Sequence, residues 1–153
     1  MPGQKILIID DETLIRTALA EYLQDVGFEM TCAADGQSGL ELCHATRYDA
    51  VLVDLRMPGM DGLQVIRTLR SEHPDTPVIV ISGTGLMEDV ISAMREGAWD
   101  YIQKPVFDMD QIKVVIDRVL EKSQLMLERK HYQLEIEKLN TSLAAEVERQ
   151  TAD

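Results

Sequence analysis

Short apolar runs, each closed by a polar or turn-forming segment, recur five times along this chain. Each run holds five or six residues, and the runs at 4–9, 50–54 and 78–82 are rich in Val, Ile and Leu, as expected for buried β-strands. Strands that alternate with helices fold into a parallel sheet covered by helices on both faces. The chain is therefore predicted to belong to the α/β class. The predicted strands cover residues 4–9, 28–33, 50–54, 78–82 and 99–103.

The segments between the strands carry apolar residues at helical spacing. In the first of them, Leu14, Ala18 and Tyr22 fall on one face, and Gly27 ends the pattern. Asp35 is a suitable N-cap for the second helix because its carboxylate can accept a backbone hydrogen bond. The predicted helices cover roughly residues 12–26, 35–45, 63–73 and 87–95, and a fifth starts near residue 108.

The fifth helix continues far beyond the predicted sheet. From Asp108 to Gln150 the sequence contains neither Gly nor Pro, and a helix of this length spans about 64 Å. Four apolar residues in its second half follow the 4-3-4 spacing of a coiled-coil seam: Tyr132, Ile136, Leu139 and Leu143. We expect a compact domain over residues 1–122 and a helical linker over 123–153. The linker is predicted to form a dimeric coiled coil leading to an output module absent from this chain, and a solitary linker helix is the alternative.

Composition excludes several classes of function. The net charge is −12, and such an acidic surface repels phosphates, so direct nucleic-acid binding is not expected. No apolar stretch reaches 18 residues, so no membrane span is expected. Cys32 and Cys43 form no CxxC pair and are predicted to be reduced thiols of a cytoplasmic protein. His44, His73 and His131 show no metal-ligand spacing in the sequence.

Polar residues with a shared chemistry follow four of the five predicted strands. Asp10 and Asp11 follow the first strand, Asp54 ends the third, Ser82 ends the fourth and Lys104 follows the fifth. The carboxyl ends of parallel strands form the edge of the sheet where ligands bind. Clustered carboxylates suit Mg²⁺, which prefers oxygen ligands, and a metal beside a carboxylate nucleophile suits phosphoryl transfer.

Each of these residues also has a simpler structural interpretation. Asp11 or Glu12 could favour the start of the first helix, and Lys104 with Pro105 could mark a strand exit. The specific signal is the order in which the residues occur. The first, third, fourth and fifth predicted strands are closed in turn by an acidic pair, an acid, a hydroxyl and a Lys-Pro pair.

This order resembles the receiver domains of two-component response regulators. The resemblance covers about residues 4–122 and rests on Asp10-Asp11, on the segment 54–62 (DLRMPGMDG), on Ser82-Gly83 and on Lys104-Pro105. It implies a flavodoxin-like, doubly wound five-stranded parallel sheet of order 2-1-3-4-5 with an extended C-terminal helix, and a cis Lys104–Pro105 peptide. Residues 80–89 and 104–108 look most like those of the stationary-phase sigma-factor regulator type.

The resemblance also implies a role for each site residue. Asp54 would accept the phosphoryl group, with Lys104 and Ser82 contacting its oxygens. Mg²⁺ would be bound by Asp11, Asp54 and the backbone carbonyl of Arg56, with Asp10 acting mostly through a metal-bound water. Ser82 and Tyr101 would form a switch pair that reshapes the surface of the fourth helix, fifth strand and fifth helix.

The implied partners are a cognate histidine kinase or phosphotransfer protein, and a second copy of the chain bound through the C-terminal helix. On this interpretation the chain is not an enzyme beyond reactions on its own Asp54. A phosphorylation-independent dimerising scaffold is an alternative. A Mg²⁺-dependent phosphatase of the haloacid dehalogenase class is another, but it needs a second Asp where this chain has Arg56.

Overall fold

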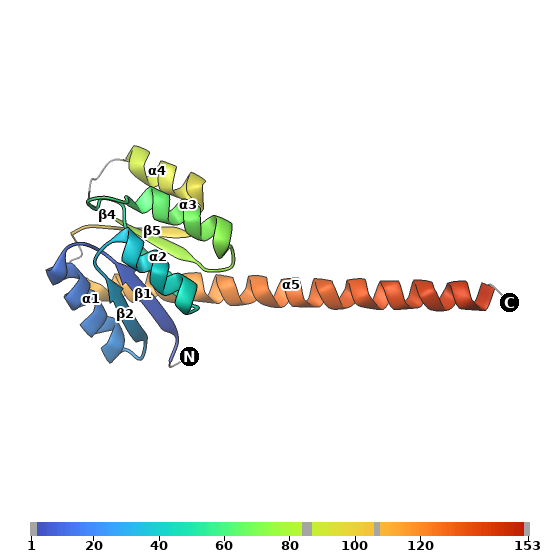
Figure 1. Ribbon diagram of the computed structural model, residues 1–153. Helices are drawn as coiled ribbons and strands as arrows, with labels where there is room; N and C mark the ends of the chain where they lie inside the picture. Colours follow the sequence, from blue (N-terminus) through green and yellow to red (C-terminus); the bar gives the residue numbers. More distant parts are fainter. Residues whose placement is uncertain (1–2, 84–86, 106–107, 152–153) are drawn as a thin grey trace. The chain divides into compact units, whose positions relative to one another are not determined.

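The computed structural model describes residues 3–83, 87–105 and 108–151 (Figure 1). The chain divides into two compact units, Met1–Leu120 and Glu121–Asp153. Within the described residues, no helix combines the length and apolar character required to cross a lipid bilayer.

The first unit alternates strands and helices as the sequence predicts. Its sheet is parallel throughout, with strand order β2-β1-β3-β4-β5, and so confirms the flavodoxin-like topology. The strands are β1 (Lys5–Ile9), β2 (Glu29–Ala33), β3 (Ala50–Asp54), β4 (Val78–Ser82) and β5 (Asp100–Gln103). The helices are α1 (Thr13–Asp25), α2 (Gly36–Ala45), α3 (Gly62–Glu72), α4 (Met87–Glu96) and α5 (Met109–Thr151).

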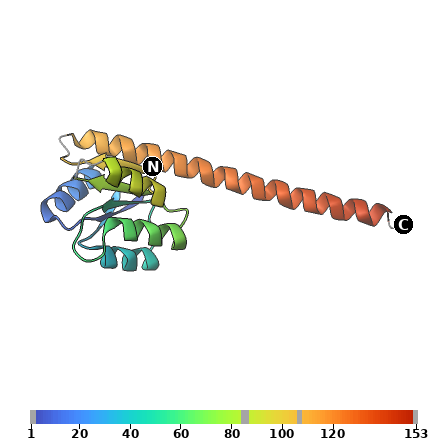
Figure 2. The same ribbon diagram turned by 90° about the horizontal axis from the view of Figure 1, so that it is seen from above.

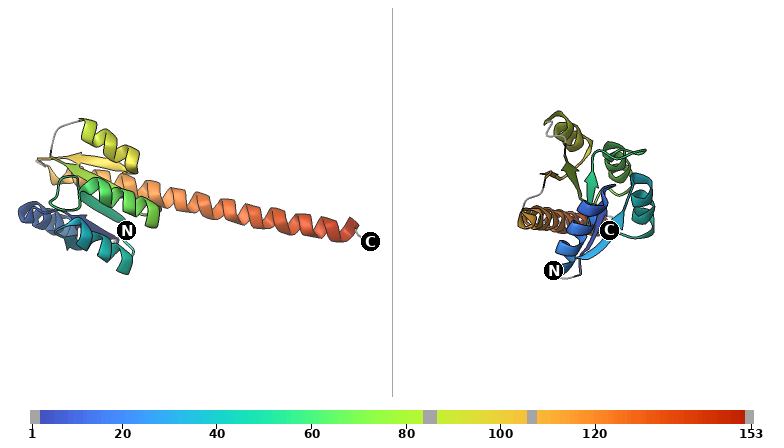
Figure 3. Two further views of the ribbon diagram at one scale, coloured as in Figure 1. Left: turned by 45° about the horizontal axis from the view of Figure 1, so that its top comes forward. Right: turned by 90° about the vertical axis from the view of Figure 1, so that its left-hand side faces the viewer.

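Two apolar cores lie on opposite faces of the sheet, and Figure 3 shows the helices that cover these faces. Helices α2, α3 and α4 cover one face, while α1 and the first three turns of α5 cover the other. The inner strands β3 and β4 are buried at every position, because helices cover both of their faces. The edge strands β2 and β5 retain exposed positions.

Element bounds differ from the prediction by at most one residue at either end, and hydrogen bonds explain some of the differences. The sequence predicts that Phe28 starts a strand, but its backbone N–H donates to Leu23 O at the end of α1. β2 therefore begins at Glu29. The predicted cap of α2 is confirmed, since the Asp35 side chain accepts from Ser38 N at 2.8 Å.

The second unit is the continuation of α5 from Glu121 to Thr151. The predicted seam residues Tyr132, Ile136, Leu139 and Leu143 are between 54% and 63% exposed. An apolar stripe of this kind on a solvated helix is what a coiled-coil partner would cover. The coiled coil remains a prediction, because a single chain cannot test it.

Candidate functional site

Strand register brings the predicted site residues to one edge of the sheet. Ile9 pairs with Val53, so Asp10 emerges beside Asp54. Ser82 pairs with Gln103 at the next two strand ends, and Lys104 follows directly. Because all five strands are parallel, these side chains share the carboxyl edge that the sequence predicted.

Lys104 forms the centre of this cluster. Its Nζ lies 3.1 Å from Asp54 Oδ2, 3.2 Å from Asp10 Oδ2 and 3.2 Å from Glu12 Oε1. The Lys104 side chain is only 10% exposed, and those of Asp10 and Asp54 are 0% and 5% exposed. Lys104, Asp10 and Asp54 are thus largely removed from water, where charge interactions are strong.

Glu12 belongs to the cluster, although the sequence suggested for it only a role at the start of α1. Carboxylate oxygens of Asp10, Asp11, Glu12 and Asp54 all lie within 4.8 Å of one another. The ion pair with Lys104 bridges residues far apart in the sequence. No local pattern separates this Glu from an ordinary first-turn acid, so its participation appears only in the folded chain.

Burial controls the electrostatics of the Asp54 carboxylate. It raises the pKa of Asp54 to about 6; Lys104 opposes this rise and the neighbouring Asp10 adds to it. Burial acts to lower the pKa of Lys104, but Asp54 and Asp10 outweigh it and hold that pKa above its usual value. The site therefore combines an amine whose charged form is favoured with a carboxylate that is costly to ionise unless a further cation arrives.

The donor set fits Mg²⁺. The Oδ2 atom of Asp10 is buried and faces Lys104 without the directional geometry of a hydrogen bond, so it keeps an unused acceptor. Asp11 adds an exposed carboxylate beside it. Carboxylate and carbonyl oxygens are the ligands that this hard cation takes, and one or two carboxylates are enough because several waters stay bound.

The predicted switch residues lie on neighbouring strands. Ser82 ends β4 and is 1% exposed, while Tyr101 on β5 is 40% exposed. The backbone of Ser82 is fixed because its carbonyl accepts from the Lys104 N–H at 2.8 Å. The Lys104–Pro105 peptide is cis, as the resemblance implies.

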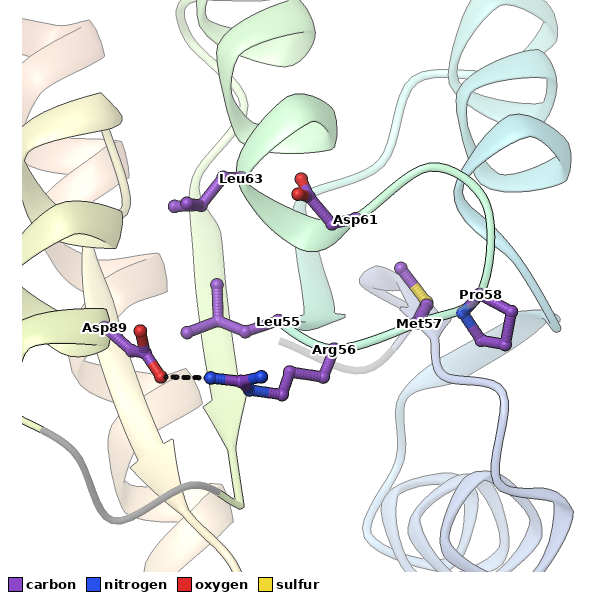
Figure 4. Close-up of a pocket in the computed structure, with 7 residues that line it drawn as sticks. All are labelled: Leu55, Arg56, Met57, Pro58, Asp61, Leu63 and Asp89. Atoms are coloured by element: carbon purple, nitrogen blue, oxygen red, sulfur yellow. Dashed lines mark hydrogen bonds and ion pairs between the residues drawn. The ribbon is translucent and has the colours of Figure 1, made fainter.

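Arg56 contacts the site through its backbone, and its side chain extends elsewhere. Its N–H donates to Asp54 Oδ1 at 3.3 Å, whereas its guanidinium pairs with Asp89 of α4 at 3.1 Å (Figure 4). A cavity of about 550 Å³ lies beside this pair. Its lining residues are Leu55, Arg56, Met57, Pro58, Asp61, Leu63 and Asp89. The loop after Asp54 is thus linked to α4, a link that the sequence did not predict.

Gly62 is a second residue whose role the sequence did not predict. A Cβ atom at this position would lie 2.4 Å from the backbone oxygen of Asp54 and 2.7 Å from Leu55 Cα. Both neighbours are backbone atoms that cannot rotate away. Glycine therefore allows the first turn of α3 to pack directly against the end of β3, which fixes the position of Asp54.

Comparison with known proteins supports the sequence resemblance. The family model of the response regulator receiver domain matches residues 6–117. The regulatory protein AtoC of Escherichia coli (strain K12) is 38% identical over 127 residues, which are 83% of this chain and 27% of that protein. This chain therefore spans about a quarter of the length of that curated relative.

Two crystal structures share the fold. NtrX from Brucella abortus in complex with ADP matches with a TM-score of 0.79 at 38% identity, covering 82% of this chain and 29% of that one. A response regulator receiver domain protein from Clostridium thermocellum matches with a TM-score of 0.75 at 30% sequence identity. The match covers 80% of this chain and 98% of that one.

Neither the relatives nor these structures test the resemblance to the sigma-factor regulator type, which stays a prediction. Part of the sequence behind it, residues 84–86 and 106–107, lies outside the described residues. The family itself is established by the matched region, which contains all but the first residue of the sheet and every predicted site residue. The chain belongs to the response regulator receiver domain family of two-component signalling systems.

Proposed function

We propose that this domain accepts a phosphoryl group on Asp54. The observation that carries the proposal is the position of Lys104 Nζ, within 3.2 Å of Asp10, Glu12 and Asp54 at the ligand-binding edge of the sheet. A buried cation at this edge attracts the oxygens of an incoming phosphoryl group. The adjacent Asp54 carboxylate supplies the nucleophile.

The proposed donor is a phosphohistidine on a histidine kinase or a phosphotransfer protein. One carboxylate oxygen of Asp54 forms a bond to phosphorus while the bond between phosphorus and the imidazole nitrogen breaks. The nitrogen keeps the bonding electron pair, and the product is an aspartyl phosphate. Lys104 then moves its hydrogen bonds from the Asp54 carboxylate to the phosphoryl oxygens, so the cation stays paired throughout.

The metal would be held by Asp11, Asp54 and the Arg56 carbonyl, with Asp10 acting mostly through a bound water. When bound, Mg²⁺ neutralises the charge on the transferring phosphoryl oxygens. The chain's own contribution is to hold Asp54 in place through the Arg56 N–H and through the close approach of Gly62.

The proposed response is a switch in Ser82 and Tyr101. The Ser82 hydroxyl turns toward the new phosphoryl oxygens, and the space that it leaves admits the Tyr101 ring, now 40% exposed. This inward rotation changes the α4-β5-α5 surface. Structures with and without a beryllofluoride mimic test it, and an unchanged Tyr101 in both states refutes the switch.

The helix beyond the receiver is proposed to associate with a second copy through Tyr132, Ile136, Leu139 and Leu143. It would pass the signal to an output module, since AtoC and the NtrX chain described above are more than three times as long as the region that they share with this chain. The seam spans only about two heptads, so we expect weak dimers that need further contacts. Ile136→Asp with Leu143→Asp is expected to give monomers in sedimentation, and equal sedimentation of wild type and variant contradicts the seam.

Labelling by acetyl phosphate in the presence of Mg²⁺ tests the acceptor. Wild type is expected to gain one phosphoryl group in intact-mass spectrometry, and Asp54→Ala is expected to gain none. Asp61→Asn is the matched control, because Asp61 lies in the same loop but caps α3 through Gln64 N. A scaffold without phosphorylation predicts no labelling of wild type, and labelling of Asp54→Ala refutes the assignment.

A further inference from the structure

A second polar cluster lies at the opposite edge of the sheet. In an alternating β/α chain the helices run antiparallel to the strands, so α2 and α3 end where the strands begin. These two helices lie side by side on one face of the sheet (Figures 1 and 2). His44 lies in the last turn of α2, Glu72 ends α3, and His73 follows as its C-cap.

Folding brings these three side chains together around a cavity. His44 Nε2 lies 3.2 Å from Glu72 Oε2, and the rings of His44 and His73 lie 5.7 Å apart between centroids. One potential ligand atom from each of the three residues lies within 4.8 Å of the other two. The adjoining cavity measures about 380 Å³ and is also lined by Thr46, Pro74 and Thr76.

His73 has an unused ring nitrogen inside the fold. Its Nε2 atom is buried and finds no hydrogen-bond partner among the described residues, which is costly for a polar atom. The backbone around it is held firmly, since its N–H donates to Leu69 O at 2.7 Å and its carbonyl accepts from Thr76 N at 3.0 Å. The backbone that carries the imidazole is therefore held in place. The Nε2 atom of the ring still has no hydrogen-bond partner among the described residues.

The helix ends favour a cation at this place. The carboxyl end of an α-helix carries a partial negative charge from its unpaired carbonyls. Both α2 and α3 end at the cluster, and Glu72 adds a full negative charge. Two imidazoles and one carboxylate then offer nitrogen and oxygen ligands to the same point.

We propose that His44, Glu72 and His73 bind a transition-metal cation of the Zn²⁺ class. Two imidazoles and one carboxylate form a recognised ligand set for Zn²⁺, with a water in the fourth position. Ligand atoms around a tetrahedral Zn²⁺ lie about 3.4 Å apart, given bonds of about 2.1 Å. The cluster must therefore contract slightly, and the half-exposed side chains of His44 and Glu72 can rotate inward toward the fixed His73.

An ordinary surface ion pair does not account for the cluster. The tail carries such a pair, in which His131 Nε2 lies 3.1 Å from Glu135 Oε1 one helical turn away. That pair has nearly the same separation as His44 and Glu72, but the metal-ligand grouping at α2 and α3 adds a second imidazole. His131 is therefore a matched control for the contribution of His73 and the helix ends.

Zn²⁺ titration of the full chain by calorimetry tests the site. Excess Mg²⁺ is included so that the acidic edge around Asp54 is occupied. Wild type is expected to bind one Zn²⁺, and His44→Ala or Glu72→Gln is expected to weaken that binding by at least about tenfold, as loss of a ligand requires. His131→Ala is expected to leave the affinity unchanged. Circular dichroism of metal-free His44→Ala confirms that this exposed substitution leaves the fold intact.

Two other outcomes of these titrations would overturn the proposed Zn²⁺ site. Equal Zn²⁺ affinity of wild type and His44→Ala would show that the cluster is only a helix-end ion pair. Loss of binding in Asp54→Asn, with His44→Ala unaffected, would place the metal at the acidic edge. A thermal melt gives a second readout, because Zn²⁺ is expected to raise the midpoint of wild type but not of His44→Ala.

Discussion

The two edges of the same sheet carry polar clusters of opposite construction. At the carboxyl edge, Asp10, Asp54 and Lys104 project from the ends of strands and are almost fully buried. At the amino edge, His44 and Glu72 project from helix ends and remain about half exposed. Removing one partner of the buried ion pairs between strand ends is therefore expected to lower the stability of the whole domain. Removing a half-exposed charge at a helix end is expected to change that stability little.

The largest effect is expected from removing the central cation. Lys104→Ala leaves the buried Asp10 and Asp54 carboxylates without their partner, and breaking such pairs costs on the order of 3 kcal/mol. Urea unfolding in EDTA at neutral pH measures this loss in the free energy of unfolding. Lys113→Ala is the control, because its pair with Asp117 is exposed and contributes at most about 0.5 kcal/mol. Equal stability of the two variants would contradict the contrast between the edges.

A smaller effect of opposite sign is expected from Asp54→Asn. The pKa of Asp54 is raised from 3.8 to about 6 in the fold, chiefly by burial, so the native state binds the proton more tightly than the unfolded state. Ionisation therefore costs stability as pH rises from about 4 to 6, and the full cost applies above that range. Asp54→Asn avoids this cost and is expected to be more stable at pH 8 by on the order of 2 kcal/mol.

Thermal melts in EDTA across pH 4 to 8 check this prediction. The advantage of Asp54→Asn is expected to shrink as pH falls through about 6 toward 4, because wild-type Asp54 then becomes protonated. Asp117→Asn, at a half-exposed carboxylate on α5, is expected to show no comparable gain. A pH-independent difference between wild type and Asp54→Asn would refute the role assigned to burial.

The smallest effect is expected at the amino edge. Without metal, His44→Ala removes only a half-exposed ion pair with Glu72 and is expected to change the free energy of unfolding by less than about 0.5 kcal/mol. Urea unfolding in EDTA measures this change beside Lys104→Ala. A loss comparable to that of Lys104→Ala would show that the two edges do not differ in the way described.

The sequence predicted the carboxyl edge because strand ends are local signals. Asp54 closes an apolar run and Lys104 precedes Pro105. Each position can therefore be recognised in the sequence without knowing which residues surround it in the fold. The parallel topology then brings them together. The topology follows from the same alternation of strands and helices, which also indicated the type and approximate bounds of every element.

Other features depend on distances between elements and leave no local pattern. Gly62 looks like an ordinary turn residue in the sequence, yet in the fold a Cβ atom there would lie 2.4 Å from the backbone oxygen of Asp54. His44 and His73 meet only because α2 and α3 end at the same edge of the sheet. Their sequence separation matches no metal-binding motif, so the sequence alone offers no sign that these two histidines come together.

Residue-level trapping of the phosphorylated protein tests the central claim most directly. The domain is treated with acetyl phosphate and Mg²⁺, and borohydride then reduces the acyl phosphate of an aspartate to homoserine, which peptide mass spectrometry locates. We predict homoserine at position 54 and at no other acidic position, with none formed when EDTA replaces Mg²⁺. Reduction at Asp10, Asp11 or Glu12 instead, or no reduced residue in a protein shown to be folded, would contradict the account.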